Sequence, residues 1–458
     1  MTKKGDSSRF KISPQRKGHQ SANHRFNLGI GMNFHLGCQK KIQSFVSSPR
    51  QVLLSIAVLH LIVLVACALD YYALELFISN YNDGQVSDQH RFVLRGKKVL
   101  SGYWPYEGLA PAESLAPPLS TYILAVPLIL ETYLFLPLAF IYRFYFSLFN
   151  LITCWMLIRI GEKQFPEREK SQIALFYGTS PFLLWQATGA DECIGAFFMV
   201  LVVYLLMVHE TPFFSAIAIG IGTAAKYYPC LLIPYVVATR TSRKEKIKVS
   251  ITSVLAILFS LLPFFLAQPN GFMNQFEVRI GRLPWDAGGN NSLVILLARM
   301  QWLNIEEEVE SFYRILWISL VVAVGLFQIL KGMNAIETAA LVPSIFFIVF
   351  PKFFFSYFLI VFPFFCMAFV RRHSSVALWC LVHASLISGQ AAVDRVVGYG
   401  SVWSQLPGQV PFLLAIGIAQ FFVIWLFLWG LILMKRDFEL DWSLPGIIRI
   451  SRIVAGSK

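Results

Sequence analysis

Long apolar runs, separated by shorter polar segments, are the most regular feature of the chain. A helix needs about 20 apolar residues to cross a bilayer core. The apolar runs at 51–69, 136–160 and 410–434 have nearly this length or more. Several middle runs are shorter, which leaves hairpins or tilted half-helices open there. The pattern predicts an all-α polytopic membrane protein of roughly twelve transmembrane helices. The expected spans are 51–69, 136–160, 173–187, 194–208, 213–224, 229–239, 249–266, 314–330, 335–350, 354–370, 376–390 and 411–434.

Two long segments interrupt this pattern, at residues 70–134 and 267–313, and both are rich in polar residues, Pro and Gly. Loops longer than about 15 residues are uncommon in compact proteins and are usually functional or disordered, and we expect function. The apolar stretch 119–130 is too short to cross, so it is expected to lie in the membrane interface or to re-enter. The predicted organisation is a basic, disordered tail at 1–50, a transmembrane region at 51–434 and a second tail at 435–458.

Composition supports a membrane protein and suggests its orientation. Apolar residues make up 56% of the 458 positions, charged residues make up 14%, and the mean hydropathy is +0.59. Soluble domains usually carry about 25% charged residues, so the composition argues against one. Short loops rich in Lys and Arg stay in the cytoplasm. An alternating path with a cytoplasmic N-terminus puts the C-terminus and every basic cluster inside, at 159–170, 240–248, 331, 371–373 and 435–436.

The same placement accounts for the net charge of +13 without nucleic acid, so we expect no nucleic-acid partner. The seven cysteines have no paired spacing, which predicts neither a disulfide framework nor a metal site. Both termini are expected in the cytoplasm. The membrane would be the plasma membrane of a prokaryote or the endoplasmic reticulum of a eukaryote.

The first long segment carries an ordered motif. Asp88 is followed by an aromatic residue, Phe92, four positions later, and then by Gly102, Pro105-Tyr106 and Pro118-Leu119. This order resembles the first luminal loop of GT-C glycosyltransferases, especially glycosyltransferase family 87 and the catalytic subunit of GPI mannosyltransferase. The spacing is the more specific part, because Pro105 follows Asp88 by seventeen positions and Gly102 by three. The GPI enzyme has an Asp-x-Asp pair whose first position is Val86 here, so metal binding by such a pair is not inherited.

Four further elements extend the resemblance. They are Thr188-Gly189-Ala190-Asp191, Ala225-Lys226-Tyr227-Tyr228-Pro229, Asn290-Asn291-Ser292-Leu293, and Pro351-Lys352 through Tyr357. The resemblance implies a GT-C-like bundle and a sugar donor carried on a polyprenyl or dolichyl phosphate. It implies mannose as the sugar and a glycolipid, glycan or protein as the acceptor. Membrane lipids are further partners, no cofactor is assigned, and the sequence leaves a divalent metal open.

Such a reaction needs a carboxylate to take a proton from the acceptor and cations to hold the phosphate. We expect Asp88 to be the catalytic base and the reaction to invert the anomeric centre. For the phosphate we expect the basic residues near the outer ends of spans, where the positive-inside bias disfavours them: Lys226, Arg279, Arg282 and Lys352. Asp191 is expected to position the acceptor, and Tyr106 could stack against a sugar ring.

Each residue also has a simpler interpretation. Asp88 and Asp191 both precede helical patterns and could be N-caps. The basic residues could snorkel to the headgroups, and the aromatic residues could belong to interfacial belts. For the whole chain, the main alternative is a multi-pass transporter or lipid flippase. The acids that collect in external segments and the lack of a visible repeat argue against it. A non-catalytic lipid-binding subunit is a third alternative.

Overall fold

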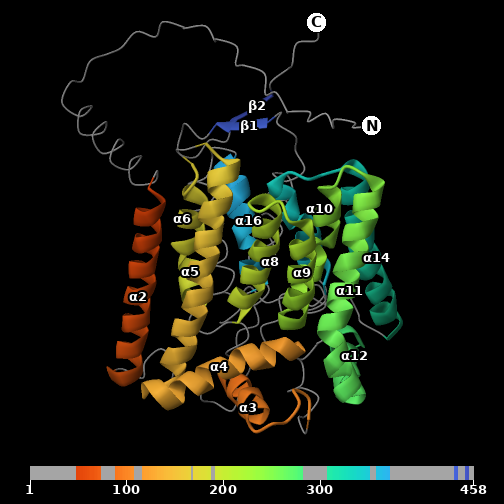
Figure 1. Ribbon diagram of the computed structural model, residues 1–458. Coiled ribbons are helices and arrows are strands. Elements are labelled where there is room, and N and C mark those ends of the chain that lie inside the picture. The colour runs from red at the N-terminus through yellow and green to blue at the C-terminus, as the bar shows by residue number, and fades with distance from the viewer. Residues whose placement is uncertain are drawn as a thin grey trace, which may run out of the picture. The chain divides into compact units, whose positions relative to one another are not determined.

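The structure is a computed structural model that describes residues 48–73, 88–107, 116–166, 169–186, 191–281, 307–350, 357–371, 438–441 and 449–452. This part of the chain is mostly helical (Figure 1). A short antiparallel ribbon of β1 (Phe438–Asp441) and β2 (Arg449–Arg452) lies in the expected C-terminal tail. The expected spans at 376–390 and 411–434 fall outside the described residues.

The first half of the helices runs from α2 to α9. Their bounds are α2 Pro49–Ala73, α3 Asp88–Leu100, α4 Pro118–Leu134, α5 Leu138–Gln164, α6 Gln172–Gly178, α7 Pro181–Gln186, α8 Glu192–Met207 and α9 Pro212–Ala225. The second half follows as η2 Tyr228–Leu232, α10 Ile233–Ala238, α11 Arg243–Ala267, α12 Pro269–Gly281, α14 Glu307–Lys331, η3 Ile336–Ala340, α15 Leu341–Val349 and α16 Phe358–Arg371.

Four stretches in the described ranges are long and apolar enough to cross a membrane: Pro49–Ala66, Phe140–Gln164, Arg243–Ala267 and Phe312–Lys331. Each coincides with an expected span. Shorter apolar helices occupy most of the remaining expected positions, including α8, α9 and α16. The helical membrane-protein class is therefore supported, whereas the count of about twelve spans stays a prediction.

Several boundaries differ from the sequence-based ones for local reasons. The expected span 173–187 is divided into α6 and α7, because Pro181 lacks a backbone N–H and begins a new helix. Helix α11 begins before residue 249, at Arg243, where the Ser242 hydroxyl accepts a hydrogen bond of 3.1 Å from the Glu245 N–H. The second external segment begins as helix α12 rather than as a loop, and the expected interfacial stretch 119–130 is the longer helix α4.

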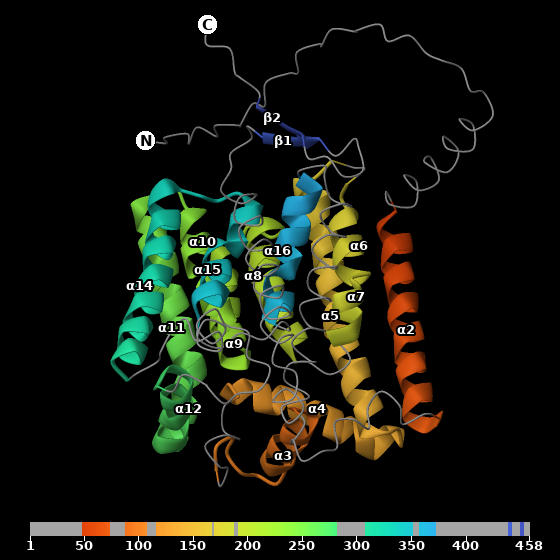
Figure 2. The same cartoon turned by 180° about the vertical axis from the view of Figure 1, so that it is seen from behind.

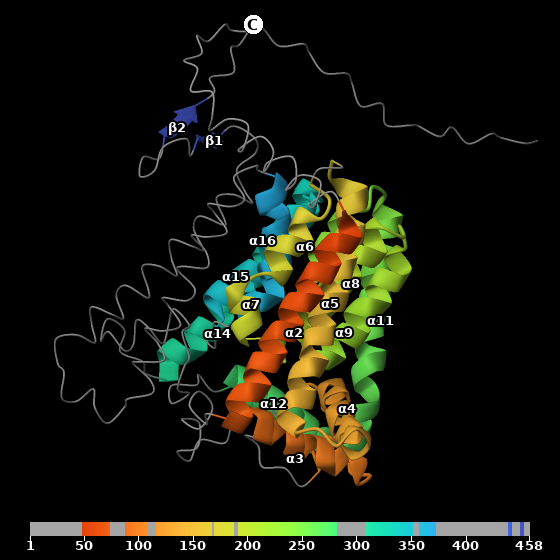
Figure 3. The ribbon, with the colours of Figure 1, turned by 90° about the vertical axis from the view of Figure 1, so that its left-hand side faces the viewer.

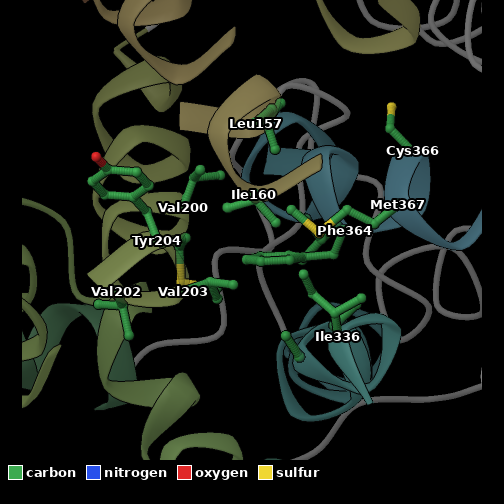
Figure 4. Packing of buried hydrophobic residues seen from close by; sticks show 14 of the residues in the cluster. Leu157, Ile160, Val200, Val202, Val203, Tyr204, Ile336, Phe364, Cys366 and Met367 are labelled. Carbon is green, nitrogen blue, oxygen red and sulfur yellow. The ribbon is translucent and has the colours of Figure 1, made fainter. Parts of the chain in front are cut away.

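The main apolar core forms where α5, α8 and α16 pack together with η3 (Figure 4). Leu157, Val203 and Phe364 are among its buried members. Helices α2, α11 and α14 instead expose many large apolar side chains, such as Leu61, Phe259 and Leu330. Exposed apolar faces on long helices are what a surrounding bilayer would cover.

The helices place two sets of connections at opposite ends. Helices α3, α4 and α12 lie at one end, and the α5–α6 and α10–α11 connections lie at the other (Figures 1, 2 and 3). At the latter end, Lys163 in the last turn of α5 lies 3.6 Å from Glu210 after α8, and the Lys246 ammonium lies 3.4 Å from the Ile329 carbonyl. The basic segments 159–170 and 240–248 are thus separated from α3 and α4, as the expected alternating path requires.

Candidate active site

A largely buried charged cluster lies where the beginning of α8 meets the end of α9, and this place is called the α8–α9 junction below. The Lys226 ammonium is 2.7 Å from Asp191 Oδ1 and 3.7 Å from Glu192 Oε1. The side chains of Lys226, Asp191 and Glu192 are only 12%, 14% and 8% exposed. Sequence reasoning named the lysine and Asp191 separately, and the structure brings them into contact.

The local fold explains why this pair forms. Asp191 stands at the N-cap position of α8, but its side chain makes no capping hydrogen bond there and instead accepts one from Lys226. Lys226 ends α9 in an extended conformation, with φ −152° and ψ 120°. Helices α8 and α9 pack closely because Gly222 has no side chain, and a Cβ there would come within 2.9 Å of Phe198 Cβ. The ends of the two helices therefore meet.

The electrostatics of the cluster favour charged groups despite its burial. Burial lowers the pKa of Lys226, but the charges of Asp191 and Glu192 and the hydrogen bond to Asp191 outweigh it and raise the pKa above its usual value. Glu192 also lies in the first turn of α8, where the helix dipole favours a negative charge. The Lys226 ammonium thus faces two carboxylates.

Helix α3, which begins at Asp88, packs on an apolar group that continues to the ends of α8 and α9. Phe92 packs on Tyr142 and Phe146 at centroid distances of 6.0 and 6.2 Å. The same buried apolar group includes Cys193, Ile194, Phe198 and Ala225, which adjoin the charged residues in sequence or on α8. Because Phe92 follows Asp88 by one helical turn, the start of α3 lies on the side of this group. The structure describes the backbone of Asp88 and not its side chain.

The chain turns after α3 at Gly102, whose φ of +85° is a conformation that favours glycine. Tyr106 follows this turn and is 6% exposed. Its hydroxyl donates to the Ala116 carbonyl at 3.2 Å and accepts from Gln275 Nε2 at 2.8 Å. Tyr106 is therefore packed into the protein, whereas Tyr103 and Trp104 are 51% and 42% exposed.

The remaining expected site residues are described incompletely. Arg279 lies on α12, but its side chain is outside the description, and Arg282 and Lys352 lie outside the described residues. Within the described ranges, no three side chains of His, Cys, Asp or Glu come together as a metal site.

Two residues in this region were not proposed from the sequence. Glu192 is one of them, and its contact with Lys226 depends on the packing of two helices. Gln275 is fully buried on α12. A glutamine in a polar loop segment gives no sequence signal of burial, so only the fold could identify it.

One comparison with known proteins identifies a family. A family model described as glycosyltransferase family 87 matches residues 115–351, which is more than half of the chain. The matched range contains Asp191, Glu192 and Lys226, whereas Asp88 and Tyr106 precede it. No curated protein matches the chain. The matched range is sufficient to conclude that the chain belongs to glycosyltransferase family 87 and is a membrane glycosyltransferase.

Proposed function

We propose that the protein transfers mannose from a polyprenyl or dolichyl phosphate to a glycolipid, glycan or protein acceptor on the extracytoplasmic face. One observation carries this function. One apolar group contains Phe92 of the helix that begins at Asp88 and also the neighbours of the Asp191–Lys226 pair. It lies towards the end of the helices away from the basic connections at 159–170 and 240–248 (Figure 1). That arrangement supports a site beside a buried lipid and opposite the cytoplasm.

Asp88 is the proposed base. It removes the proton from the acceptor hydroxyl while that oxygen attacks the anomeric carbon. The bond from this carbon to the phosphate oxygen breaks at the same time, and its electron pair leaves with the lipid phosphate. Attack opposite the leaving group inverts the anomeric centre. A positioned carboxylate contributes about 10²–10⁴-fold to such a reaction.

Lys226 is the proposed contact for the departing phosphate, with Arg279, Arg282 and Lys352 as the other cations. Its pairing with Asp191 and Glu192 means that it would share its three N–H donors between these carboxylates and the phosphate. Stabilisation of the leaving group by a cation in a site with little water is a large catalytic effect.

Asp191 is the proposed contact for the acceptor. A carboxylate oxygen that is not used for helix capping can accept hydrogen bonds from sugar hydroxyls. The hydrogen bond from Lys226 orients Asp191 for that role. Tyr106 contributes by supporting the wall of the site, since its ring is buried against Phe272.

The test uses the purified full-length chain and a radiolabelled polyprenyl-phosphate mannose. Asp88→Asn keeps the shape and the capping ability of the residue, because Asn caps helices about as well as Asp. We expect it to lower transfer by about 10²-fold or more and to leave donor binding and thermal stability near parental. The matched control is Glu107→Gln, which amidates an exposed acid of the same segment and should leave transfer unchanged.

Transfer at the parental rate by Asp88→Asn would remove Asp88 from the mechanism. A parental protein that moves the lipid across vesicles but never releases sugar to any acceptor would favour a flippase and contradict the proposed function.

A further inference from the structure

The side-chain amide of Gln275 joins two segments that are far apart in the chain. It is 0% exposed, and it lies in the middle of α12. Its Nε2 donates to the Tyr106 hydroxyl at 2.8 Å, and its Oε1 accepts from the Tyr227 hydroxyl. A single buried amide therefore connects the turn after α3 to the segment between α9 and η2.

The contacts around Tyr106 show that this turn is built onto α12. The backbone N–H of Tyr106 donates to Gln268 Oε1 at 3.0 Å, just before the helix begins. The Tyr106 ring packs edge-on against Phe272 at a centroid distance of 6.2 Å. A Cβ at Gly271 would lie 2.7 Å from Tyr106 Cβ, so only glycine allows this approach. The turn after α3 therefore packs closely against the first two turns of α12.

The contacts around Tyr227 extend this connection to the charged cluster. Tyr227 directly follows Lys226, and together they form the short segment between the end of α9 and the beginning of η2. Lys226 is held from one side by Asp191 of the α8 N-terminus. The Gln275–Tyr227 hydrogen bond holds the adjacent residue from the side of α12.

A buried amide is an expensive way to fill space, because its polar atoms need partners in a region that apolar side chains could occupy. A fully paired buried polar group is directional, however, and it favours one arrangement of the segments it joins. The bridge thus favours one position of α12 relative to the segment that carries Lys226.

We propose that Gln275 is a positioning residue that holds the segment carrying Lys226 against α12, so that the Lys226 ammonium can reach the phosphate of the lipid-linked donor. This role rests on the proposed function, because it assumes that Lys226 binds the donor phosphate. It assigns no chemistry to Gln275 itself, which touches neither the donor nor the acceptor.

The test measures the affinity of the purified full-length protein for polyprenyl phosphate. Gln275→Met keeps the length of the side chain and removes both hydrogen bonds. The matched control is Gln328→Met, because Gln328 is also 0% exposed and its Nε2 donates to the Thr338 carbonyl at 2.8 Å, away from the charged cluster. We expect Gln275→Met to weaken binding by about tenfold, which corresponds to the loss of one well-placed ionic contact. Gln328→Met should stay within about twofold of the parental protein.

Tyr227→Phe is the milder second variant, and it carries the test if Gln275→Met does not fold. It removes the Tyr227 hydroxyl, which donates to Gln275 Oε1 next to Lys226, and we expect binding about fivefold weaker than parental. A merely structural role would lower thermal stability in all three variants and weaken binding equally in Gln275→Met and Gln328→Met. Parental affinity in Tyr227→Phe and Gln275→Met would also overturn the role. Failure of the parental protein to bind polyprenyl phosphate would contradict the proposed function itself.

Discussion

Two basic regions of this protein differ in their surroundings. At the start of α11, Arg243, Lys244 and Lys248 are exposed. At the end of α9, Lys226 is 12% exposed and contacts two carboxylates. The first region has the properties of a solvated cluster that orients the chain, and the second has the properties of a site.

The difference separates two interpretations that the sequence left open for Lys226. A snorkelling lysine places its ammonium among headgroups and water. The Lys226 ammonium instead lies against Asp191 at 2.7 Å, and its alkyl chain lies near Gly195, where an added Cβ would be 3.6 Å from Lys226 Cβ. Position at a helix end is common to both regions, so burial and pairing are the features that distinguish them.

The largest expected effect is that of Lys226→Met, which removes the ammonium that pairs with the largely buried carboxylates of Asp191 and Glu192. Breaking a buried ion pair by removing one partner usually costs about 3–5 kcal/mol, so we expect a clear loss of thermal stability and of donor binding. The control is Lys248→Met in the exposed cluster, which should change stability by less than about 0.5 kcal/mol. Equal effects of the two variants would remove the distinction between the regions.

A second variant moves the backbone below Lys226 without changing any charge. Gly222→Ala adds a Cβ that would lie 2.9 Å from Phe198 Cβ and 3.0 Å from Pro229 Cγ. Overpacking of this kind usually costs about 1–3 kcal/mol, and we expect transfer to fall because the end of α9 shifts away from α8. Thermal unfolding and transfer rate are measured on the same preparation. Unchanged values of both would show that the junction tolerates displacement.

The exposed region should respond differently to a change in its own helix cap. Ser242→Ala removes the hydrogen bond to the Glu245 N–H and should cost about 1 kcal/mol of stability. Ser242→Asn should restore most of this loss, because Asn is a good N-cap. The rate of sugar transfer at saturating donor should stay parental in both, and a large fall in rate would place α11 in the reaction.

The smallest expected effect concerns the pH dependence of the stability that Lys226 contributes, which should hardly change at mildly alkaline pH. The pKa of Lys226 is raised in the folded protein, so the stability that its charge contributes is complete below the unfolded value of about 10.4. It falls progressively as the pH rises from that value towards the higher folded pKa, above which it is lost. The difference in unfolding free energy between parental and Lys226→Met protein should therefore stay constant from about pH 8 to 10. A difference that shrinks within this range would contradict the raised pKa.

Much of the helical pattern could be predicted from the sequence, because the long apolar runs at 51–69 and 249–266 require no knowledge of tertiary contacts. The division of 173–187 at Pro181 could have been predicted too, since proline begins rather than continues a helix. The sequence also indicated a helix after Asp88, and the structure has α3 there, beginning at Asp88 itself and ending at Leu100.

The assembly of the site could not be predicted in the same way. Asp191 and Lys226 are separated by two helices, and nothing in their spacing indicates an ion pair. The role of Gln275 depends on Tyr106 and Tyr227 reaching it from different segments. Contacts of this kind arise from packing, and a pattern read along one chain does not contain them.

The central claim is that sugar transfer takes place beside α3 and the α8–α9 junction, and not beside the basic cluster of α11. The most direct test is photo-crosslinking of the full-length protein with a polyprenyl-phosphate sugar that carries a diazirine on the sugar, followed by mass spectrometry of the labelled peptides. We expect labelled peptides from residues 88–107 and 191–229, and competition by unlabelled donor. Labelling that unlabelled donor suppresses, but that is confined to residues 159–170 and 240–248, would place the donor at the opposite end of the helices and contradict the account.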